Sequence, residues 1–349
     1  MSMSMAKKIT KQTVLTLAGV AIAFTGVFGG AVVISKINEK QPANAAEVTS
    51  VTTYTPQKKE APSMTSESTE MQFKKDMDLI LVMGTDNRKT LDEQESYINY
   101  SQADCLYLYA IDHKNKTYQV LQISRETMCD VQTYTTGGQP FGVDKMQICL
   151  AHSYGKNERE RCLNTVDAAS ALLFDIPISH YVSFGMDSIG ILNDKVGGVT
   201  VTVPEGEGLA EVDPAFVDGA TVTLDGKQAE LFVRSRYVLK NDHNEPRMAR
   251  QEIFMKAFKE QAKAKMEADQ NFAPSLLLAL SDNMYSDMSA NDLSNLATKL
   301  REYKDLGTLT TTGEIVEEGP GHLFREFYVN KEDLQKKVME LCYEPKSEG

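Results

Sequence analysis

Residues 78–86 read Asp-Leu-Ile-Leu-Val-Met-Gly-Thr-Asp, and this stretch decides the fold class. Five consecutive apolar side chains, Leu79 to Met83, leave no polar face. A strand with one face in water alternates polar and apolar residues, whereas an uninterrupted run predicts a central strand buried on both faces. Gly84 ends the run. The segment therefore predicts a sheet that is covered by other elements.

The segments that follow extend this sheet and add helices to it. Residues 105–111 and 118–123 are rich in β-formers and are joined by the polar residues 112–117, which predicts a hairpin. Residues 162–174 have helical apolar spacing and end before Ile176-Pro177. The same criteria predict strands at 181–184, 199–203, 306–312 and 324–329, and helices at 186–196, 227–232, 250–268, 276–280, 292–300 and from Lys331 onward. Strands interleaved with helices predict an α/β fold, a layered mixed sheet covered by helices, with one domain as the simplest organisation.

The N-terminal segment has the pattern of a membrane anchor. Lys7, Lys8 and Lys11 precede an uncharged apolar run over residues 14–34, which as a helix would reach about 32 Å and match the hydrocarbon core of a bilayer. Lysines on the N-terminal side favour a cytoplasmic N-terminus. We therefore expect residues 1–13 inside the cell, one N-terminal transmembrane helix at 14–34, and the rest of the chain outside.

A cleaved secretory signal is the alternative to an anchor, because Ala43-Asn44-Ala45 resembles an A-x-A cleavage site. That site lies beyond the apolar run, and the run is longer than the usual signal core of roughly 7–15 residues, so we expect an uncleaved anchor. Residues 35–75 are rich in Thr, Ser, Glu and Pro, which is typical of an extended linker. The globular part is expected to begin at residue 76.

The composition restricts the function. The chain has 349 residues, is 42% hydrophobic and carries a net charge of −12, which excludes a disordered protein and argues against a nucleic-acid binder, since phosphate backbones require a basic surface. Its five cysteines include no CxxC pair, and the five histidines form no zinc motif. Two possibilities stay open for the thiols. They are buried in the core, or an exported chain forms a disulfide, with Cys149 and Cys162 as the nearest pair in the sequence.

The arginines are concentrated in short polar motifs. Six of the ten lie in four of them: Arg88, Arg125, Arg234, Arg236, Arg247 and Arg250. A single arginine is usually a surface ion-pair residue, but four within residues 234–250 of an acidic chain favour an anion site. Guanidinium groups donate paired hydrogen bonds that match phosphate oxygens. The clusters therefore predict binding of a phosphate or diphosphate.

Two aspartates lie between the buried strand and the first predicted hairpin strand. Asp86 follows the buried strand, and Asp104 directly precedes the next one, so the two carboxylates are expected to meet at one end of the sheet. Either residue alone could be a turn or cap residue. Two carboxylates beside a diphosphate are a common way to hold Mg²⁺.

These residues belong to a longer collinear series of motifs, and the series resembles the LytR-CpsA-Psr family of cell-envelope glycopolymer ligases over about residues 78–257. The motifs are GTDNR (84–88), ADCLYL (103–108), ISRET (123–127), DKM (144–146), GGVTVTVP (197–204), GKQA (226–229), VRSR (233–236) and RMARQ (247–251).

The resemblance implies a membrane-anchored phosphotransferase in a Gram-positive-type envelope. Such an enzyme moves a glycopolymer, for example a teichoic acid or capsular polysaccharide, from a polyprenyl-diphosphate carrier onto a peptidoglycan acceptor, with Mg²⁺ at the diphosphate. It implies an LCP-like catalytic domain over residues 76–268, with residues 269–349 as a C-terminal α/β extension packed on the same domain. By motif, Asp86 and Asp104 would hold the metal, and Asp86 and Arg125 would be catalytic. The diphosphate would contact Arg88, Arg125, Lys145, Arg234, Arg236, Arg247 and Gln251.

The chain departs from the family pattern at three places. It has Ser124-Arg125-Glu126 where the family usually has Pro-Arg-Asp, and Ala103-Asp104-Cys105 where the family has Ser-Asp-Thr, while residues 91–100 resemble an insertion. Two alternatives to the transferase stay open. One is a polyprenyl-diphosphate-glycan pyrophosphatase or hydrolase, in which water replaces the sugar hydroxyl at the same electrophile. The other is a non-catalytic envelope-binding or regulatory protein on the same fold.

Overall fold

The computed structural model describes residues 61–62, 64–66, 69–86, 96–99, 101–235, 244–269, 272–300, 302–317 and 324–346. These residues divide between two compact units rather than the single domain expected from the sequence. The sheet unit contains the described residues up to Gly185, Met284–Met288 and those from Thr308 onward. The helical unit contains Met186–Asn283 and Ser289–Gly307. The predicted extension, residues 269–349, therefore contributes to both units.

The sheet unit is built on a mixed six-stranded sheet with the order β11-β8-β3-β4-β5-β12. Strands β3 and β8 are parallel, and the pairs β3/β4, β4/β5 and β11/β8 are antiparallel. The bounds are Met77–Thr85 for β3, Ala103–Asp112 for β4, Thr117–Ile123 for β5, His180–Phe184 for β8, Met284–Ser286 for β11 and Lys304–Thr310 for β12. The division between the two units falls within β12, after Gly307. The buried run is confirmed as a central strand, because all five side chains from Leu79 to Met83 are buried.

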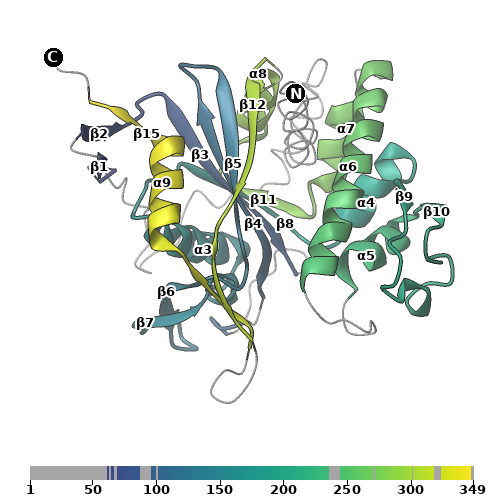
Figure 1. Cartoon of the computed structure of the whole chain (residues 1–349), viewed down its shortest axis with the longest axis horizontal. Coiled ribbons are helices and arrows are strands. Elements are labelled where there is room, and N and C mark those ends of the chain that lie inside the picture. Colours follow the sequence, from purple (N-terminus) through teal and green to yellow (C-terminus); the bar gives the residue numbers. More distant parts are fainter. Residues whose placement is uncertain are drawn as a thin grey trace, which may run out of the picture. The chain divides into compact units, whose positions relative to one another are not determined.

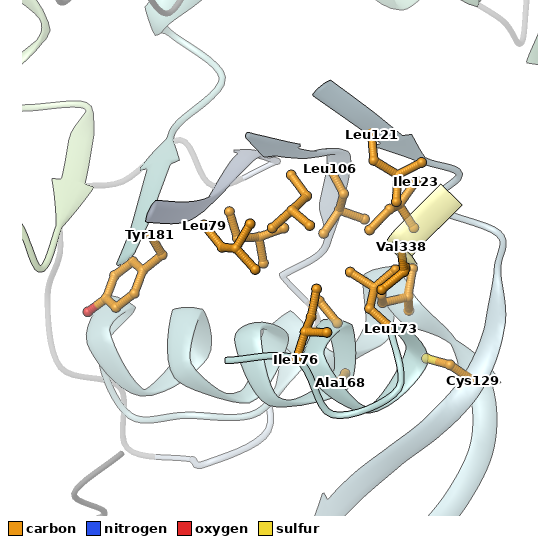
Figure 2. Packing of buried hydrophobic residues seen from close by; sticks show 14 of the residues in the cluster. Leu79, Leu106, Leu121, Ile123, Cys129, Ala168, Leu173, Ile176, Tyr181 and Val338 are labelled. Atoms are coloured by element: carbon orange, nitrogen blue, oxygen red, sulfur yellow. The ribbon is translucent and has the colours of Figure 1, made fainter. Parts of the chain in front are cut away.

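Helices α3 (Glu158–Leu172) and α9 (Lys331–Cys342) contribute apolar side chains to the same core as the sheet. Figure 2 shows Leu79, Leu106 and Leu121 pointing from the strands toward residues of α3 and of the segment after it, including Ala168 and Ile176. Each of these strand side chains is at most 1% exposed. Figure 1 shows α3 and α9 beside the sheet. Burial of this apolar surface is the main force that holds the unit together.

The predicted linker is wrong at its C-terminal end. Within residues 35–75, strands β1 (Met64–Ser66) and β2 (Thr69–Phe73) form a small sheet with the C-terminal strand β15 (Tyr343–Pro345). Met71 and Phe73 pack against the core of the sheet unit, and the rings of Phe73 and Tyr343 lie 5.5 Å apart. The pairing partner lies about 270 residues away, as in the register Phe73 with Tyr343, so local composition could not reveal it.

Two further hairpins complete the sheet unit. Strands β6 (Met128–Tyr134) and β7 (Pro140–Gln147) pair with each other and precede the short 3-10 helix η1 (Ile148–Ser153), and all three were missed by the sequence analysis. Strands β13 (Gly313–Val316) and β14 (Glu326–Val329) form the other pair, of which only β14 was predicted.

The helical unit contains most of the remaining elements. These are α4 (Ser188–Val196), β9 (Thr200–Thr202), η2 (Leu209–Glu211), β10 (Thr221–Thr223), α5 (Gly226–Arg234), α6 (Asn244–Ala268), α7 (Phe272–Leu280) and α8 (Ala290–Leu300). Helix α5 begins with a capping box, in which Asp225 accepts from the Gln228 amide at 2.7 Å and the Gln228 side chain accepts from the Asp225 amide at 3.2 Å. Phe254 and Phe258 of the predicted apolar face of α6 are buried, and their rings stack.

The predicted N-terminal segments, residues 1–13 and 14–34, lie outside the described residues. Within the part of the chain that the structure describes, none of the helices has the length and apolar character needed to cross a membrane. All five cysteines are described and are free thiols, so Cys149 and Cys162 do not form the disulfide that the sequence left open. Four of the thiols are buried, and Cys105 is half-buried.

Candidate active site

Asp86 follows directly after β3, at the edge of the sheet where β4 begins. Its backbone amide donates to the Gln102 carbonyl at 3.1 Å. Its side-chain Oδ1 accepts from the Gln102 amide at 2.7 Å and from the Ser101 hydroxyl at 3.2 Å. The backbone bond and the two side-chain bonds together fix Asp86 to the residues that precede β4.

A β-bulge sets the direction of Asp104. Gly84 pairs with Cys105 and Thr85 with Ala103, so Asp104 is the extra residue on β4. In a regular strand Asp104 would share the face of Leu106, whereas with the bulge Ala103 takes the fully buried position. The Asp104 side chain is 29% exposed as a result. An unpaired carboxylate in an apolar core is energetically costly, and the bulge avoids this cost by turning Asp104 away from the core. Bulges often change the direction of a side chain in this way beside active sites.

Arg125 lies two residues after β5, which runs antiparallel to β4 and so ends at the same edge of the sheet. Its Nη1 donates to Asp104 Oδ1 and its Nη2 donates to the side-chain Oε1 of Gln102. Nη2 also lies 3.6 Å from Cys149 Sγ. The side chain is only 14% exposed. The guanidinium is therefore held in one orientation by two oxygen acceptors, which is the preorganisation that a phosphate-binding arginine needs.

The charges of this edge support a permanent cation beside a neutral thiol. Burial opposes the charge on Arg125, but the interactions with Cys149 and Asp104 outweigh it and raise the pKa of Arg125. Burial also raises the pKa of the Cys149 thiol, although the neighbouring guanidinium opposes that effect. Arg125 thus stays charged at all relevant pH values, and Cys149 stays protonated near neutrality.

We call this group of residues the arginine–carboxylate cluster; it consists of Asp86, Gln102, Asp104, Arg125 and Cys149. The sequence predicted that Asp86 and Asp104 meet at one end of the sheet, and Arg125 was a candidate by motif alone. The structure brings all three together through Gln102. Gln102 and Cys149 were missed. Gln102 could have been found from its position two residues before Asp104, because a polar residue close to a predicted metal-binding aspartate is a candidate hydrogen-bond partner of the site. Cys149 had no comparable signal, because η1 was not predicted.

Lys145 is placed on β7, where it forms a 3.0 Å ion pair with Asp130 on β6. Both side chains are at least half exposed, at 51% for Lys145 and 66% for Asp130. An exposed pair of this kind contributes little to stability. The cross-strand contact accounts for the position of Lys145, and its role toward a diphosphate stays a prediction.

The remaining described candidates lie in the helical unit. Arg234 forms an ion pair with Glu230 one turn earlier on α5. Gln251 on α6 donates to the Val233 carbonyl at 3.3 Å, and Arg250 beside it donates to the carbonyls of Phe232 and Ser235. These carbonyls are the ones that the C-terminal end of a helix leaves without intrahelical partners. Gln251 and Arg250 therefore cap α5.

Arg247 is buried, with 6% exposure. Arg88 and Arg236, and most of the predicted insertion at residues 91–100, lie outside the described residues. In its described part, Ile98 forms a bridge with Tyr154, and the Tyr97 amide donates to the Thr136 carbonyl at 2.9 Å.

The fold and the cluster together define the chain as an α/β protein whose mixed sheet carries a fixed arginine and two carboxylates at one edge. The chain belongs to the LytR_cpsA_psr family, whose family model matches residues 43–339. This assignment confirms the resemblance found in the sequence motifs.

Curated relatives cover only part of the chain. It is 25% identical over 223 residues to TagU of Enterococcus faecalis, which spans 64% of this chain and 65% of the relative. It is 29% identical over 161 residues to TagV of Bacillus subtilis, which spans 45% of this chain and 37% of the relative. Both relatives are named polyisoprenyl-teichoic acid–peptidoglycan teichoic acid transferases. The chain thus spans less than two thirds of the length of these relatives.

Solved structures show the same fold. A protein from Streptococcus agalactiae, gbs0355, aligns with a TM-score of 0.56 at 22% identity and covers 76% of this chain and 87% of its own. TagT of Bacillus subtilis aligns with a TM-score of 0.53 at 21% identity and covers 76% of this chain and 90% of its own. The mixed α/β architecture is therefore confirmed.

Proposed function

We propose that the protein is a phosphotransferase that moves a glycopolymer from a polyprenyl-diphosphate carrier onto peptidoglycan. The names of the relatives support this proposal, since they are transferases of teichoic acid to peptidoglycan. The observation that carries it in the structure is the guanidinium of Arg125, held by Asp104 and Gln102 beside Asp86.

In the proposed reaction an acceptor hydroxyl attacks the phosphorus next to the glycan. The new bond joins that phosphorus to the acceptor oxygen, the bond to the polyprenyl phosphate breaks, and polyprenyl phosphate leaves with its electron pair. Arg125 stabilises the charge that develops on the transferring phosphate, because its donors are already oriented before the substrate binds. Asp86 takes the proton of the attacking hydroxyl on Oδ2, since Oδ1 accepts the two hydrogen bonds from Gln102 and Ser101.

The donor set of the cluster fits Mg²⁺. Asp86 and Asp104 supply carboxylate oxygens, and Asp104 Oδ2 accepts none of the hydrogen bonds described above. Mg²⁺ is typically held by one or two carboxylates together with substrate phosphates and water, so two aspartates suffice. We propose that they hold Mg²⁺, which when bound would neutralise the diphosphate oxygens.

Product analysis tests the proposed function. The full chain in detergent is incubated with a labelled lipid-linked glycan, Mg²⁺ and peptidoglycan oligomers. Label joined to peptidoglycan supports the transferase, free glycan phosphate supports the hydrolase, and no turnover with an authentic donor and acceptor supports the binding or regulatory protein.

Asp104→Asn should lower the turnover of this reaction and its dependence on Mg²⁺. The matched control is Asp76→Asn, an exposed aspartate at the opposite end of β3 from the cluster. Equal Mg²⁺ dependence in Asp104→Asn, Asp86→Asn and the wild type would remove the metal from this site.

We further propose that residues 14–34 anchor the protein in the cell membrane with the described units outside. The apolar run and its N-terminal lysines support this orientation. A reporter fused after Gly349 should then be active only outside the cytoplasm, and the chain should stay in the membrane fraction. Cytoplasmic reporter activity would contradict the orientation, and release of a chain that begins near Ala46 would contradict the anchor.

A further inference from the structure

A second group of chemically reactive side chains is buried in the sheet unit, apart from the arginine–carboxylate cluster. His152 on η1 and Glu158 and Cys162 on α3 bring a ring nitrogen, a carboxylate oxygen and a thiol within 4.8 Å of one another. None of the three residues is more than 3% exposed. The spacing is His-x5-Glu-x3-Cys, which matches none of the common zinc motifs, and His152 lies on a different element from the other two residues. The pair Glu158 and Cys162 lies one turn apart on one face of α3.

The distances among these atoms match a tetrahedral metal site. His152 Nε2 lies 3.2 Å from Glu158 Oε1, and Cys162 Sγ lies 3.8 Å from the same oxygen. A tetrahedral zinc ion with usual bond lengths separates its nitrogen, oxygen and sulfur ligands by about 3.3–3.6 Å. The three side chains therefore need only small adjustments to hold such an ion.

His152 is oriented as a metal-binding histidine is. The Thr165 hydroxyl donates to the Arg161 carbonyl at 2.9 Å, so its oxygen is free to accept from His152 Nδ1, which lies 3.2 Å away. This contact at Nδ1 orients the ring so that Nε2 faces Glu158 and Cys162. Nε2 is buried and, within the described part of the chain, is not aligned for a hydrogen bond with any partner, although Glu158 Oε1 is close. A hydrogen bond to the other ring nitrogen is the usual outer support of a metal-bound histidine.

Glu158 is fixed in its ionised form. Its Oε2 accepts from Arg161 Nε at 3.1 Å, and its Oε1 accepts from the Ser183 hydroxyl at 2.7 Å. Burial alone would raise the pKa of Glu158, but His152, Ser183 and Arg161 outweigh burial and lower this pKa to about 2. Arg161 thus occupies Oε2 and leaves Oε1 directed at His152 and Cys162.

We propose that His152 Nε2, Glu158 Oε1 and Cys162 Sγ bind a divalent transition-metal ion of the zinc class. Imidazole, carboxylate and thiolate together select such an ion over Mg²⁺ or Ca²⁺, which prefer oxygen ligands. On binding, the Cys162 S–H bond breaks, the sulfur keeps the electron pair and forms the metal–sulfur bond, and the proton leaves to solvent.

The site would be structural. It joins η1 to α3, and the carboxylate is bonded to Ser183 on β8, so a bound ion would tie three elements of the sheet unit together. The proposal does not rest on the proposed transferase activity. Its test therefore measures metal content and spectra of the protein rather than turnover.

The experiment uses the full chain produced in minimal medium that contains either Zn²⁺ or Co²⁺. Elemental analysis of the purified protein should find stoichiometric zinc, and the cobalt form should show a thiolate-to-cobalt charge-transfer band together with visible bands of a tetrahedral ion. Cys162→Ala and His152→Gln should lose the metal and these bands. The matched controls are Cys129→Ala and Cys342→Ala, which remove buried thiols outside the proposed metal site. These variants should keep the metal and the cobalt bands.

Thr165→Val provides a variant that leaves all three ligands in place. Removal of an outer partner of a metal-bound histidine typically lowers affinity by about 10- to 100-fold, so Thr165→Val should bind cobalt more weakly in a competition titration with a chelator. This loss keeps the proposal testable if Cys162→Ala does not fold. The proposal would be overturned if the wild type purified from either medium contained no metal. It would also be overturned if Cys162→Ala and Thr165→Val bound the metal with wild-type affinity.

Discussion

Replacing Arg125 with lysine separates charge from geometry in the arginine–carboxylate cluster. The guanidinium donates hydrogen bonds to Asp104 from Nη1 and to Gln102 from Nη2. A lysine has one side-chain nitrogen and cannot reproduce this planar pair of donors. At least one charge-assisted hydrogen bond is lost, which should lower the free energy of unfolding by about 1.5–3 kcal/mol. If Arg125 also orients donors toward the transferring phosphate, the turnover number should fall further, by roughly 10²–10³.

The assay pairs two measurements on the same protein. Urea unfolding followed by far-UV circular dichroism gives the stability, and transfer of labelled glycan to peptidoglycan oligomers gives kcat and KM. Arg159→Lys is the matched control, because Arg159 is an exposed arginine on α3 of the same unit. Arg125→Lys should lose kcat at saturating donor while it remains folded at the assay temperature. A normal kcat in Arg125→Lys would refute the catalytic role. A loss of stability in Arg125→Lys no larger than that in Arg159→Lys would refute the argument that the planar pair of donors is needed.

Two further predictions concern the stability of the sheet unit. Val131→Ala on β6 removes two methyl groups from a side chain that is 1% exposed and should lower the free energy of unfolding by about 2 kcal/mol. Val143 on the neighbouring β7 is 62% exposed, so Val143→Ala should change the free energy of unfolding by less than about 0.5 kcal/mol. Equal urea midpoints for the two variants would contradict the assigned core. Glu158 has a folded-state pKa of about 2 against 4.5 when unfolded, so its ionised form stabilises the fold above about pH 4.5 and this contribution is lost as the pH falls toward 2. Measured in the presence of a chelator that removes bound metal, the stability of the wild type should therefore fall more steeply between pH 5 and pH 3 than that of Glu158→Gln. Parallel pH profiles would show that the pKa of Glu158 is not lowered.

The central sheet could be predicted because its signals are local. The apolar run Leu79–Met83 and the two β-rich segments after it require no knowledge of distant residues, and the structure confirms β3 and the β4/β5 hairpin. Helix α3 is confirmed for the same reason, since its apolar spacing and the following Pro177 are both in the segment. Strands β1 and β2 could not be predicted from their own composition, because their partner β15 is supplied by the far end of the chain.

The site was predictable in its charged residues but not in its geometry. Aspartates and arginines stand out in the sequence, and their positions next to predicted strands place Asp86 and Asp104 at one end of the sheet. The bulge that re-aims Asp104 depends on how β3 and β4 pair, and the contact of Arg125 with Cys149 depends on η1. Gln251 and Arg250 illustrate a different difficulty. Their motif suggested phosphate binding, but in the structure both side chains donate hydrogen bonds to carbonyls at the C-terminal end of α5.

The same limit applies to His152, Glu158 and Cys162. They meet only when η1 packs on α3, and a search for zinc motifs with short spacing does not find them.

The fate of the phosphorus atom next to the glycan tests the central claim most directly. A polyprenyl-diphosphate glycan carrying ³²P only at that position is incubated with the full chain, Mg²⁺ and peptidoglycan oligomers, and both products are separated. A phosphotransferase places the ³²P in a phosphodiester on peptidoglycan and leaves an unlabelled polyprenyl monophosphate, and Arg125→Lys should slow both in parallel. Recovery of ³²P as free glycan phosphate, or on the lipid product, would contradict the account.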